Sequence, residues 1–217
     1  DPVRMLRAVV LAARLEFTID DASLDAIDQH KHEIARSAAP RLLEEYFKIL
    51  RSGHAAEAFR QLHDTGLLRE ITPELDEAPE AFWDAVRRID TYRRQFGSAP
   101  EALTNAILAG TLLQPLGLIG RRTRFHADPL ERRIELGLLP IARKDVERLQ
   151  QIFSIMPRVL DTQAPFRTQR GLLHRSSLDE ALTWLAIHDD RPDVLAHWAE
   201  LKAERREHPA PVAVAEE

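Results

Sequence analysis

Residues 39–75 read APRLLEEYFKILRSGHAAEAFRQLHDTGLLREITPEL, and this stretch contains the clearest helix signals of the chain. Pro40 suits the first turn of a helix, where a missing N–H costs nothing. Gly53 and Gly66 stand where a helix-ending glycine is preferred. The pattern therefore predicts a helix from Pro40 to Gly53, a second helix that ends at Gly66, and a short helical turn closed by Pro73.

Apolar residues recur at helical spacing along almost the whole chain, and no segment shows convincing strand-like alternation. We therefore expect an all-α protein of several helices without a β-sheet. In the first helix, Val3, Leu6, Val10 and Ala13 are expected to face the same way. A helix that begins at Pro100 is apolar nearly all round, so it should be central to the core of the second half. The other expected helices lie at 2–15, 23–35, 82–96, 130–137, 143–156, 177–188 and 192–206.

The turn at Pro73 suggests a soft boundary near Glu77. We expect a first helical unit over 1–76 and a larger helical unit over 77–206. The last residues, 207–217, have nothing to pack against and are expected to be disordered.

Composition excludes several classes of protein. The chain has 217 residues and no cysteine, so disulfides and thiolate metal sites are excluded and a reducing compartment fits. No apolar run reaches the roughly 18 residues of a membrane helix, and no segment resembles a signal peptide. The expected location is the cytoplasm, with no membrane partner.

Charge is distributed unevenly along the chain. The span from Arg121 to Arg175 holds 12 basic and 6 acidic residues, a balance of +6; since the whole chain carries −5, the remainder carries −11. Local charge attracts a polyanion more than the total does. The span is therefore either a solvated helical surface or an RNA-binding one. If it binds RNA, the candidates for phosphate contacts are Arg121, Arg122, Arg124, Arg132 and Arg133 in a glycine-bounded segment, with Arg143, Lys144 and Arg148 as weaker candidates on the following helix.

The sequence lacks the motifs of a catalytic centre. Gly117 and Gly120 are not followed by the Lys-Ser/Thr of a phosphate-binding loop. No Asp-x-Asp pair is present, although phosphoryl transfer onto a hydroxyl generally uses paired acidic metal ligands. His30 and His32 point to different faces of a helix, so a shared metal is not expected. We identify no catalytic residue and no metal ligand.

The first seven residues, DPVRMLR, combine a capped helix start with two arginines. Asp1 is a favourable N-cap, and Pro2 suits the first turn. Arg4 and Arg7 follow at helical spacing, so Asp1 and Arg7 lie about 60° to either side of Arg4 and all three can reach one cleft.

These residues resemble the tail of the Glu-Asp-x-x-Arg motif of the class II nucleotidyltransferases, the bacterial poly(A) polymerases and tRNA CCA-adding enzymes. Asp1 and Arg4 match its Asp and Arg, and Arg7 matches the second arginine usual in the family. LRAVVLAARLEFTIDDAS at 6–23 is similar to the run that follows the motif. The stretch 39–75 is similar to the next family helices, and ALTNAILAGTLLQPLG at 102–117 looks like a helix of the poly(A) polymerase branch.

The resemblance implies that residues 1–76 are a neck, the domain that reads the nucleotide base. Asp1, Arg4 and Arg7 would bind ATP as substrate, while Arg41 and Glu45, which match the family's neck motif, would form an internal ion pair that supports the cleft. A carboxylate beside a guanidinium suits the amino donor and ring-nitrogen acceptor of adenine or cytosine.

The resemblance also implies that residues 77–206 are a body that binds RNA 3′ ends. The family's catalytic head, with its Mg²⁺ ligands, is expected upstream of Asp1, so this chain alone is expected to be inactive. With its head it would add AMP to RNA 3′ ends. The alternatives are the same portion of a tRNA CCA-adding enzyme and a free-standing helical adaptor without an enzymatic role.

Overall fold

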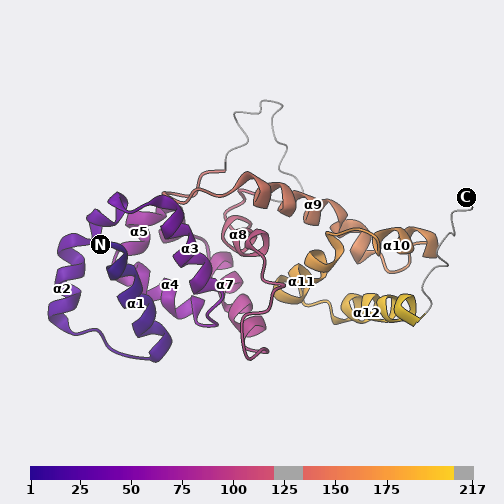
Figure 1. Ribbon diagram of the computed structural model, residues 1–217, viewed down its shortest axis with the longest axis horizontal. Helices are drawn as coiled ribbons and strands as arrows, with labels where there is room; N and C mark the ends of the chain where they lie inside the picture. Colours follow the sequence, from indigo (N-terminus) through magenta and orange to yellow (C-terminus); the bar gives the residue numbers. More distant parts are fainter. Residues whose placement is uncertain (120–133, 208–217) are drawn as a thin grey trace, which may run out of the picture.

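The computed structural model describes residues 1–119 and 134–207, and within these ranges every regular element is a helix (Figure 1). The all-α prediction is therefore confirmed. The predicted disordered tail lies almost wholly outside the described residues. The elements, in chain order, are α1 Val3–Leu15, α2 Asp21–His30, the 3₁₀ helix η1 Lys31–Arg36, α3 Ala39–Leu50, α4 Ala55–Asp64, α5 Leu67–Ile71, α6 Pro73–Asp76, α7 Glu80–Arg93, α8 Asn105–Leu113, α9 Arg143–Leu160, α10 Phe166–Leu172, α11 Leu178–His188 and α12 Pro192–Glu207.

The stretch 39–75 forms the helices that its proline and glycine positions predict. α3 carries Pro40 in its first turn, directly after the extended residue Ala38. Gly66 follows α4 with φ of +74°, a left-handed conformation that glycine adopts at little cost. Pro73 begins α6 rather than ending the helical stretch, because its ring is compatible with a first turn.

The helix α1 begins one residue later than predicted and is not capped by the Asp1 side chain. Pro2 occupies the N-cap position, and no side chain caps the helix. The inward face carries Val3, Leu6, Val9 and Ala13, so Val9 replaces the predicted Val10 as a core residue. α2 is also shorter than predicted, because the chain tightens into η1 at Lys31.

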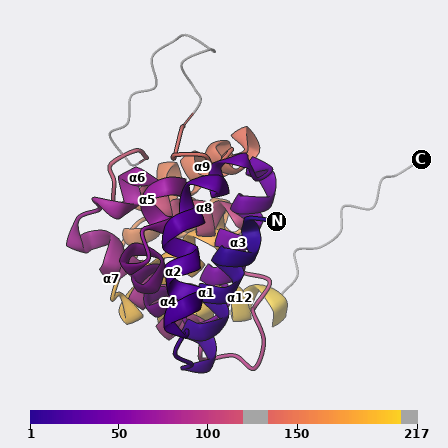
Figure 2. The ribbon, with the colours of Figure 1, turned by 90° about the vertical axis from the view of Figure 1, so that its left-hand side faces the viewer.

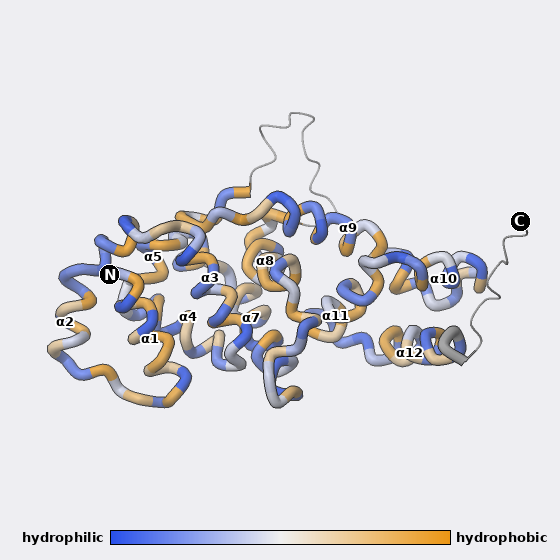
Figure 3. Tube along the Cα trace, in the orientation of Figure 1, coloured by the Kyte–Doolittle hydropathy of each residue, from blue (hydrophilic) through white to orange (hydrophobic). Residues whose placement is uncertain are grey.

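The helix α8 lies at the centre of the molecule and is the most apolar helix along the trace, coloured mainly orange in Figure 3. All residues from Ala106 to Leu113 are buried. The helix begins at Asn105 and not at Pro100, because the Thr104 hydroxyl caps it by accepting a hydrogen bond from the Ile107 N–H.

One hydrophobic core runs through both halves of the chain. α7 packs against α4 on one side and against α8 and α11 on the other, and α9 packs against α8 and α11. The helices follow one another along the long axis in Figure 1, and Figure 2 shows the same arrangement with the end formed by α1 to α4 facing the viewer. The boundary near Glu77 therefore divides the chain without interrupting its core, and the division into two units stays a prediction.

The segment before α9 returns to the N-terminal helices. Leu138 donates its N–H to the Ile71 carbonyl at 2.8 Å, and the Gly137 N–H donates to Glu74 at 3.1 Å. A Cβ at Gly137, where φ is +52°, would lie 2.1 Å from the Ile71 oxygen, so this approach requires glycine. The helix predicted at 130–137 is not formed over its described residues, 134–137, and residues 130–133 lie outside the described ranges. α10 was not predicted.

Gly110 sets how closely α8 approaches its neighbours. A Cβ there would lie 2.6 Å from side-chain carbons of both Leu149 and Trp184, well inside van der Waals contact. We expect Gly110→Ala to lower the free energy of unfolding by about 1–3 kcal/mol, because the overpacking outweighs the gain in helix propensity. Urea unfolding measures this. Gly171→Ala in α10 is the matched control, since a Cβ there meets nothing within 4 Å; equal changes in both variants would contradict the packing argument.

His188 links α11 to α8 as a neutral side chain. Its Nε2 lies 3.1 Å from the Thr111 hydroxyl, and its ring contacts Trp184 with centroids 4.1 Å apart. Burial, helped by the nearby positive charge of Arg88, lowers the pKa of His188 from 6.5 to about 3.

The pKa of His188 is lower in the folded than in the unfolded state, so its contribution to stability is complete above about pH 6.5 and is lost as the pH falls toward 3. Between pH 7 and 5 we expect the free energy of unfolding to fall with a slope approaching about 1.4 kcal/mol per pH unit. The variant His188→Gln, which cannot titrate, should give a flatter profile in urea unfolding. The exposed His32→Gln serves as control, and an unchanged slope in His188→Gln would rule out this assignment.

Candidate functional site: a charged cluster between α1 and α3

Five charged residues, Asp1, Arg4, Arg7, Arg41 and Glu45, form a cluster where the start of α1 meets α3; we call them the α1–α3 cluster. Arg41 donates from both terminal nitrogens to Asp1, with Nη2 to Oδ2 at 2.9 Å and Nη1 to Oδ1 at 3.4 Å. Arg7 donates from Nε at 3.0 Å and from Nη2 at 2.5 Å to Glu45 Oε1. Two ion pairs therefore connect the first residues of the chain to α3.

This pairing corrects the prediction of an Arg41–Glu45 ion pair. The two side chains lie one turn apart on α3, but each reaches across to a partner near α1 instead. Helical spacing allowed the internal pair, since residues four apart are neighbours. The tertiary contact of α1 with α3 offered each of them a longer-range partner that a linear pattern does not reveal.

Glu45 is the buried member of the cluster, with a side chain that is 11% exposed. Burial alone would raise the pKa of its carboxyl group, but hydrogen bonds from Arg7 and Lys48 outweigh burial and hold the pKa below its ordinary value. Glu45 is therefore ionised at neutral pH. An ionised carboxylate in this position requires its cationic partners, so it fixes where Arg7 lies.

Arg4 differs from the other cationic members of the cluster. Its side chain is exposed, and it forms no hydrogen bond or ion pair with any residue in 1–119 or 134–207. The Asp1 carboxylate is 42% exposed while Arg41 holds its orientation. The cluster thus places an oriented acceptor and a guanidinium with open donors near the same helix start. This is the donor and acceptor set that recognises the edge of a base.

The predicted RNA-contacting residues divide into those the structure describes and those it does not. Arg121, Arg122, Arg124, Arg132 and Arg133 lie outside the described residues. In α9, Arg143 pairs with Glu147 at 2.7 Å, with both side chains more than half exposed. Lys144 is exposed and makes no ion pair within the described ranges. Both stay predicted RNA contacts.

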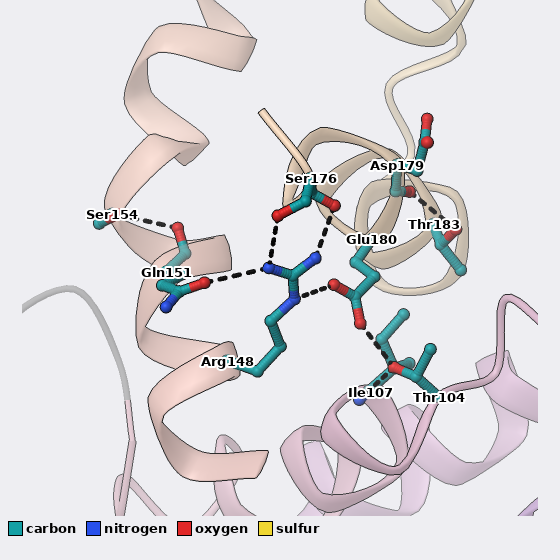
Figure 4. A network of polar contacts seen from close by, with 9 residues as sticks. All are labelled: Thr104, Ile107, Arg148, Gln151, Ser154, Ser176, Asp179, Glu180 and Thr183. Carbon is teal, nitrogen blue, oxygen red and sulfur yellow. Dashed lines mark hydrogen bonds and ion pairs between the residues drawn. The ribbon is translucent and has the colours of Figure 1, made fainter. Parts of the chain in front are cut away.

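Arg148 is a predicted RNA contact, but its guanidinium forms hydrogen bonds with other residues of the protein (Figure 4). Its Nε donates to Glu180 of α11, its Nη1 to Gln151 and to the Ser176 hydroxyl at 3.0 Å each, and its Nη2 to the Ser176 carbonyl at 2.6 Å. Glu180 also accepts from the Thr104 hydroxyl at 2.9 Å. Arg148 therefore joins α9 to α11 and, through Glu180, to the start of α8. Its donors are used inside the protein, so the structure gives Arg148 a structural role, and its predicted RNA contact stays a prediction.

No metal centre is apparent in the part of the chain that the structure covers. Among those residues, no group of three or more His, Asp or Glu side chains is placed to bind a metal ion. None of the helices in the same part is long and apolar enough to cross a membrane.

Arg7 holds Glu45 in its ionised state, which can be measured directly. We expect Arg7→Met to raise the pKa of the Glu45 carboxyl, because burial then acts with only Lys48 opposing it. Carboxyl carbon chemical shifts followed by NMR across pH 2 to 8 give that pKa. Arg14→Met, which removes an exposed arginine from the same helix, should leave it unchanged; an unchanged Glu45 pKa in Arg7→Met would exclude the cross-helix pair.

Comparison with known proteins finds similarity in the N-terminal part of the chain. Residues 16–78 match the family model described as "Probable RNA and SrmB- binding site of polymerase A". Poly(A) polymerase I of Salmonella typhi is 35% identical over 75 residues, which cover 35% of this chain and 16% of that protein.

Two CCA-adding proteins are also similar. The Multifunctional CCA protein of Xanthomonas campestris pv. campestris is 40% identical over 81 residues, which cover 35% of this chain and 20% of that protein. The CCA-adding enzyme of Geobacillus sp. is 29% identical over 103 residues, which cover 45% of this chain and 25% of that protein. The matches thus span a quarter or less of each relative's length. In its matched N-terminal part, the chain is similar to bacterial poly(A) polymerases and CCA-adding enzymes.

Proposed function

We propose that this chain is the neck and body portion of a bacterial poly(A) polymerase. Joined to a catalytic head, it would read the incoming nucleotide and bind RNA while AMP is added to the RNA 3′ end. The observation that carries the proposal is the α1–α3 cluster: Asp1 and Arg7 form ion pairs with Arg41 and Glu45 of α3, and exposed Arg4 lies one turn from both Asp1 and Arg7 in the sequence. The family match over residues 16–78 supports RNA as the polymer.

The cluster suits the Watson–Crick edge of adenine. The Asp1 carboxylate accepts from the exocyclic amino group, while the Arg4 guanidinium donates to the neighbouring ring nitrogen. Guanine and uracil present a carbonyl and an N–H at these two positions instead, so a carbonyl would face the Asp1 carboxylate and an N–H would face the Arg4 guanidinium. Loss of such a pair costs roughly 1–3 kcal/mol of discrimination. Arg41 would hold the Asp1 carboxylate in place. Arg7, which the resemblance implies as a third nucleotide contact, donates to Glu45 instead, so in this proposal it supports the cleft without contacting the base.

The head would supply the chemistry that this chain's described residues do not. Paired carboxylates that hold Mg²⁺ belong to the head in this proposal, and Mg²⁺ would activate the RNA 3′ hydroxyl and neutralise the triphosphate of ATP. The chain itself contributes base selection and RNA binding, so we propose that it does not incorporate nucleotides when separated from a head.

The second candidate is CCA addition to tRNA, favoured by the 40% identity with the Multifunctional CCA protein of Xanthomonas campestris. Cytosine presents the same donor and acceptor pattern as adenine, so the cluster alone accepts both. Extension assays on a generic RNA with ATP, and on tRNA lacking its 3′ end with CTP and ATP, separate the two activities.

Arg4 is the residue that tests base reading. In the enzyme carrying the head, we expect Arg4→Ala to reduce the preference for ATP over GTP and UTP by roughly 5- to 150-fold, which corresponds to 1–3 kcal/mol. Incorporation of each of the four nucleotides is measured separately. Arg14→Ala, on the same helix, should leave the preference intact. If Arg4→Ala lowered all four rates by one common factor, Arg4 would not read the base.

A further inference from the structure

The short helix α10 has an inward face that is firmly fixed. Gln169 and Leu172 are buried on this face. The Gln169 amide nitrogen donates to the carbonyls of Thr162 and Ala164 at 2.9 and 2.7 Å, and its oxygen lies 2.7 Å from Nε2 of His197 in α12. These contacts set the rotation of α10 about its own axis, and with it the identity of the residues that face outward.

The outward face of α10 carries Phe166, Arg167, Arg170 and Gly171, all of them exposed. Residues three and four apart in a helix are surface neighbours, with Cβ atoms about 5–6 Å apart. Arg170 is therefore adjacent to both Phe166 and Arg167. Phe166 is 61% exposed, a large apolar surface for one side chain to leave in water. An aromatic ring and two guanidiniums thus share one small surface.

Among the residues that the structure describes, Arg167 and Arg170 have no ion-pair partner, although the chain has more acidic than basic residues. Neither Arg167 nor Arg170 forms an ion pair or hydrogen bond with the residues that the structure describes. By contrast, Arg87 pairs with both Glu80 and Asp84, and Arg191 pairs with Asp193. Adjacent like charges on a helix repel each other. An anionic ligand bound to this surface would therefore reduce the repulsion between the two arginines.

Gly171 has no side chain, so the backbone of α10 is accessible beside Phe166, Arg167 and Arg170. A glycine inside a helix costs up to about 1 kcal/mol relative to alanine. A Cβ at Gly171 would meet no atom within 4 Å in the part of the chain that the structure describes, so no contact there requires the glycine. Its position on the outward face allows a ligand to approach the α10 backbone closely.

We propose that the outward face of α10 is a binding site for single-stranded RNA. The Phe166 ring stacks on an unpaired base, Arg167 and Arg170 bind the flanking phosphates, and Gly171 makes room for the ribose–phosphate chain. Single-strand binding uses this combination of an aromatic platform and cationic side chains. A duplex is excluded as the preferred ligand, because its bases are already stacked. The inference rests on the proposed function for its ligand and adds a site on the body to it.

The test measures the affinity of the 217-residue chain for a fluorescent oligoadenylate by anisotropy at several salt concentrations. We expect Phe166→Ala to weaken binding at least about fivefold. Arg167→Ala with Arg170→Ala should reduce the salt slope by about 1.4, since each phosphate contact on a single strand contributes about 0.7. Gly171→Ala should weaken binding without lowering the midpoint of thermal unfolding.

Matched controls remove similar groups elsewhere. Phe96→Ala removes another exposed aromatic ring, and Arg87→Ala with Arg191→Ala removes two arginines that have carboxylate partners. Both control variants should bind oligoadenylate as the unmodified chain does. Circular dichroism establishes that every variant is folded.

The outcomes separate this inference from the proposed function. If the unmodified chain binds oligoadenylate and the α10 variants bind it equally well, the α10 site is wrong and the RNA-binding function stands. If the unmodified chain does not bind RNA even at low salt, the proposed function is itself wrong. If the arginine variant weakens binding of heparin and RNA alike while Phe166→Ala changes neither, α10 is a general anion-binding surface, and the stacking site is excluded.

Discussion

The enclosure of α8 is the constraint on which the rest of the fold depends. Every residue from Ala106 to Leu113 is buried, so the helix has no face turned to water. Burying a leucine or isoleucine side chain contributes about 1.5–3 kcal/mol, and α8 places several of them at the same centre. A helix apolar on all sides needs partners on all sides, which α3, α7 and α9 provide. The N-terminal and C-terminal helices are thereby held to one core.

Polar contacts then fix the orientation of the helices around that core. The Asp90 carboxylate accepts the N–H groups of Ala55 and Ala56 at 2.7 and 2.9 Å and so ties the start of α4 to α7. Arg148 and Glu180 connect α9 to α11. Each such carboxylate is costly to bury alone and is stabilised only with its donors in place. These contacts specify position, while apolar burial supplies most of the stability. The α1–α3 cluster follows the same principle at the edge where a ligand could approach.

The sequence predicted the helical class and most helices because their signals are local. Pro40 and Gly66 act within one turn of their own position, and they were interpreted correctly. The start of α8 was placed wrongly because Pro100 is also a plausible first-turn residue, whereas Thr104 supplies the cap. α10 was missed because seven residues carry too little periodicity to distinguish a helix from a loop. The partners of Arg41 and Glu45 depend on which helices meet, and no spacing rule contains that information.

Which helices meet also decides which charges are paired, and this explains how a chain of net charge −5 can offer the proposed sites for a polyanion. Total charge counts every residue equally, whereas a ligand meets only the charges that the fold leaves unpaired. Arg7, Arg41 and Arg148 are matched by carboxylates, so their charge is largely cancelled where it stands. Arg4 at one end of the molecule and Arg170 at the other are not matched among the described residues. Because a guanidinium without a carboxylate partner keeps its donors for a ligand, the pattern of ion pairs, rather than composition, determines where the proposed nucleotide and RNA sites can lie.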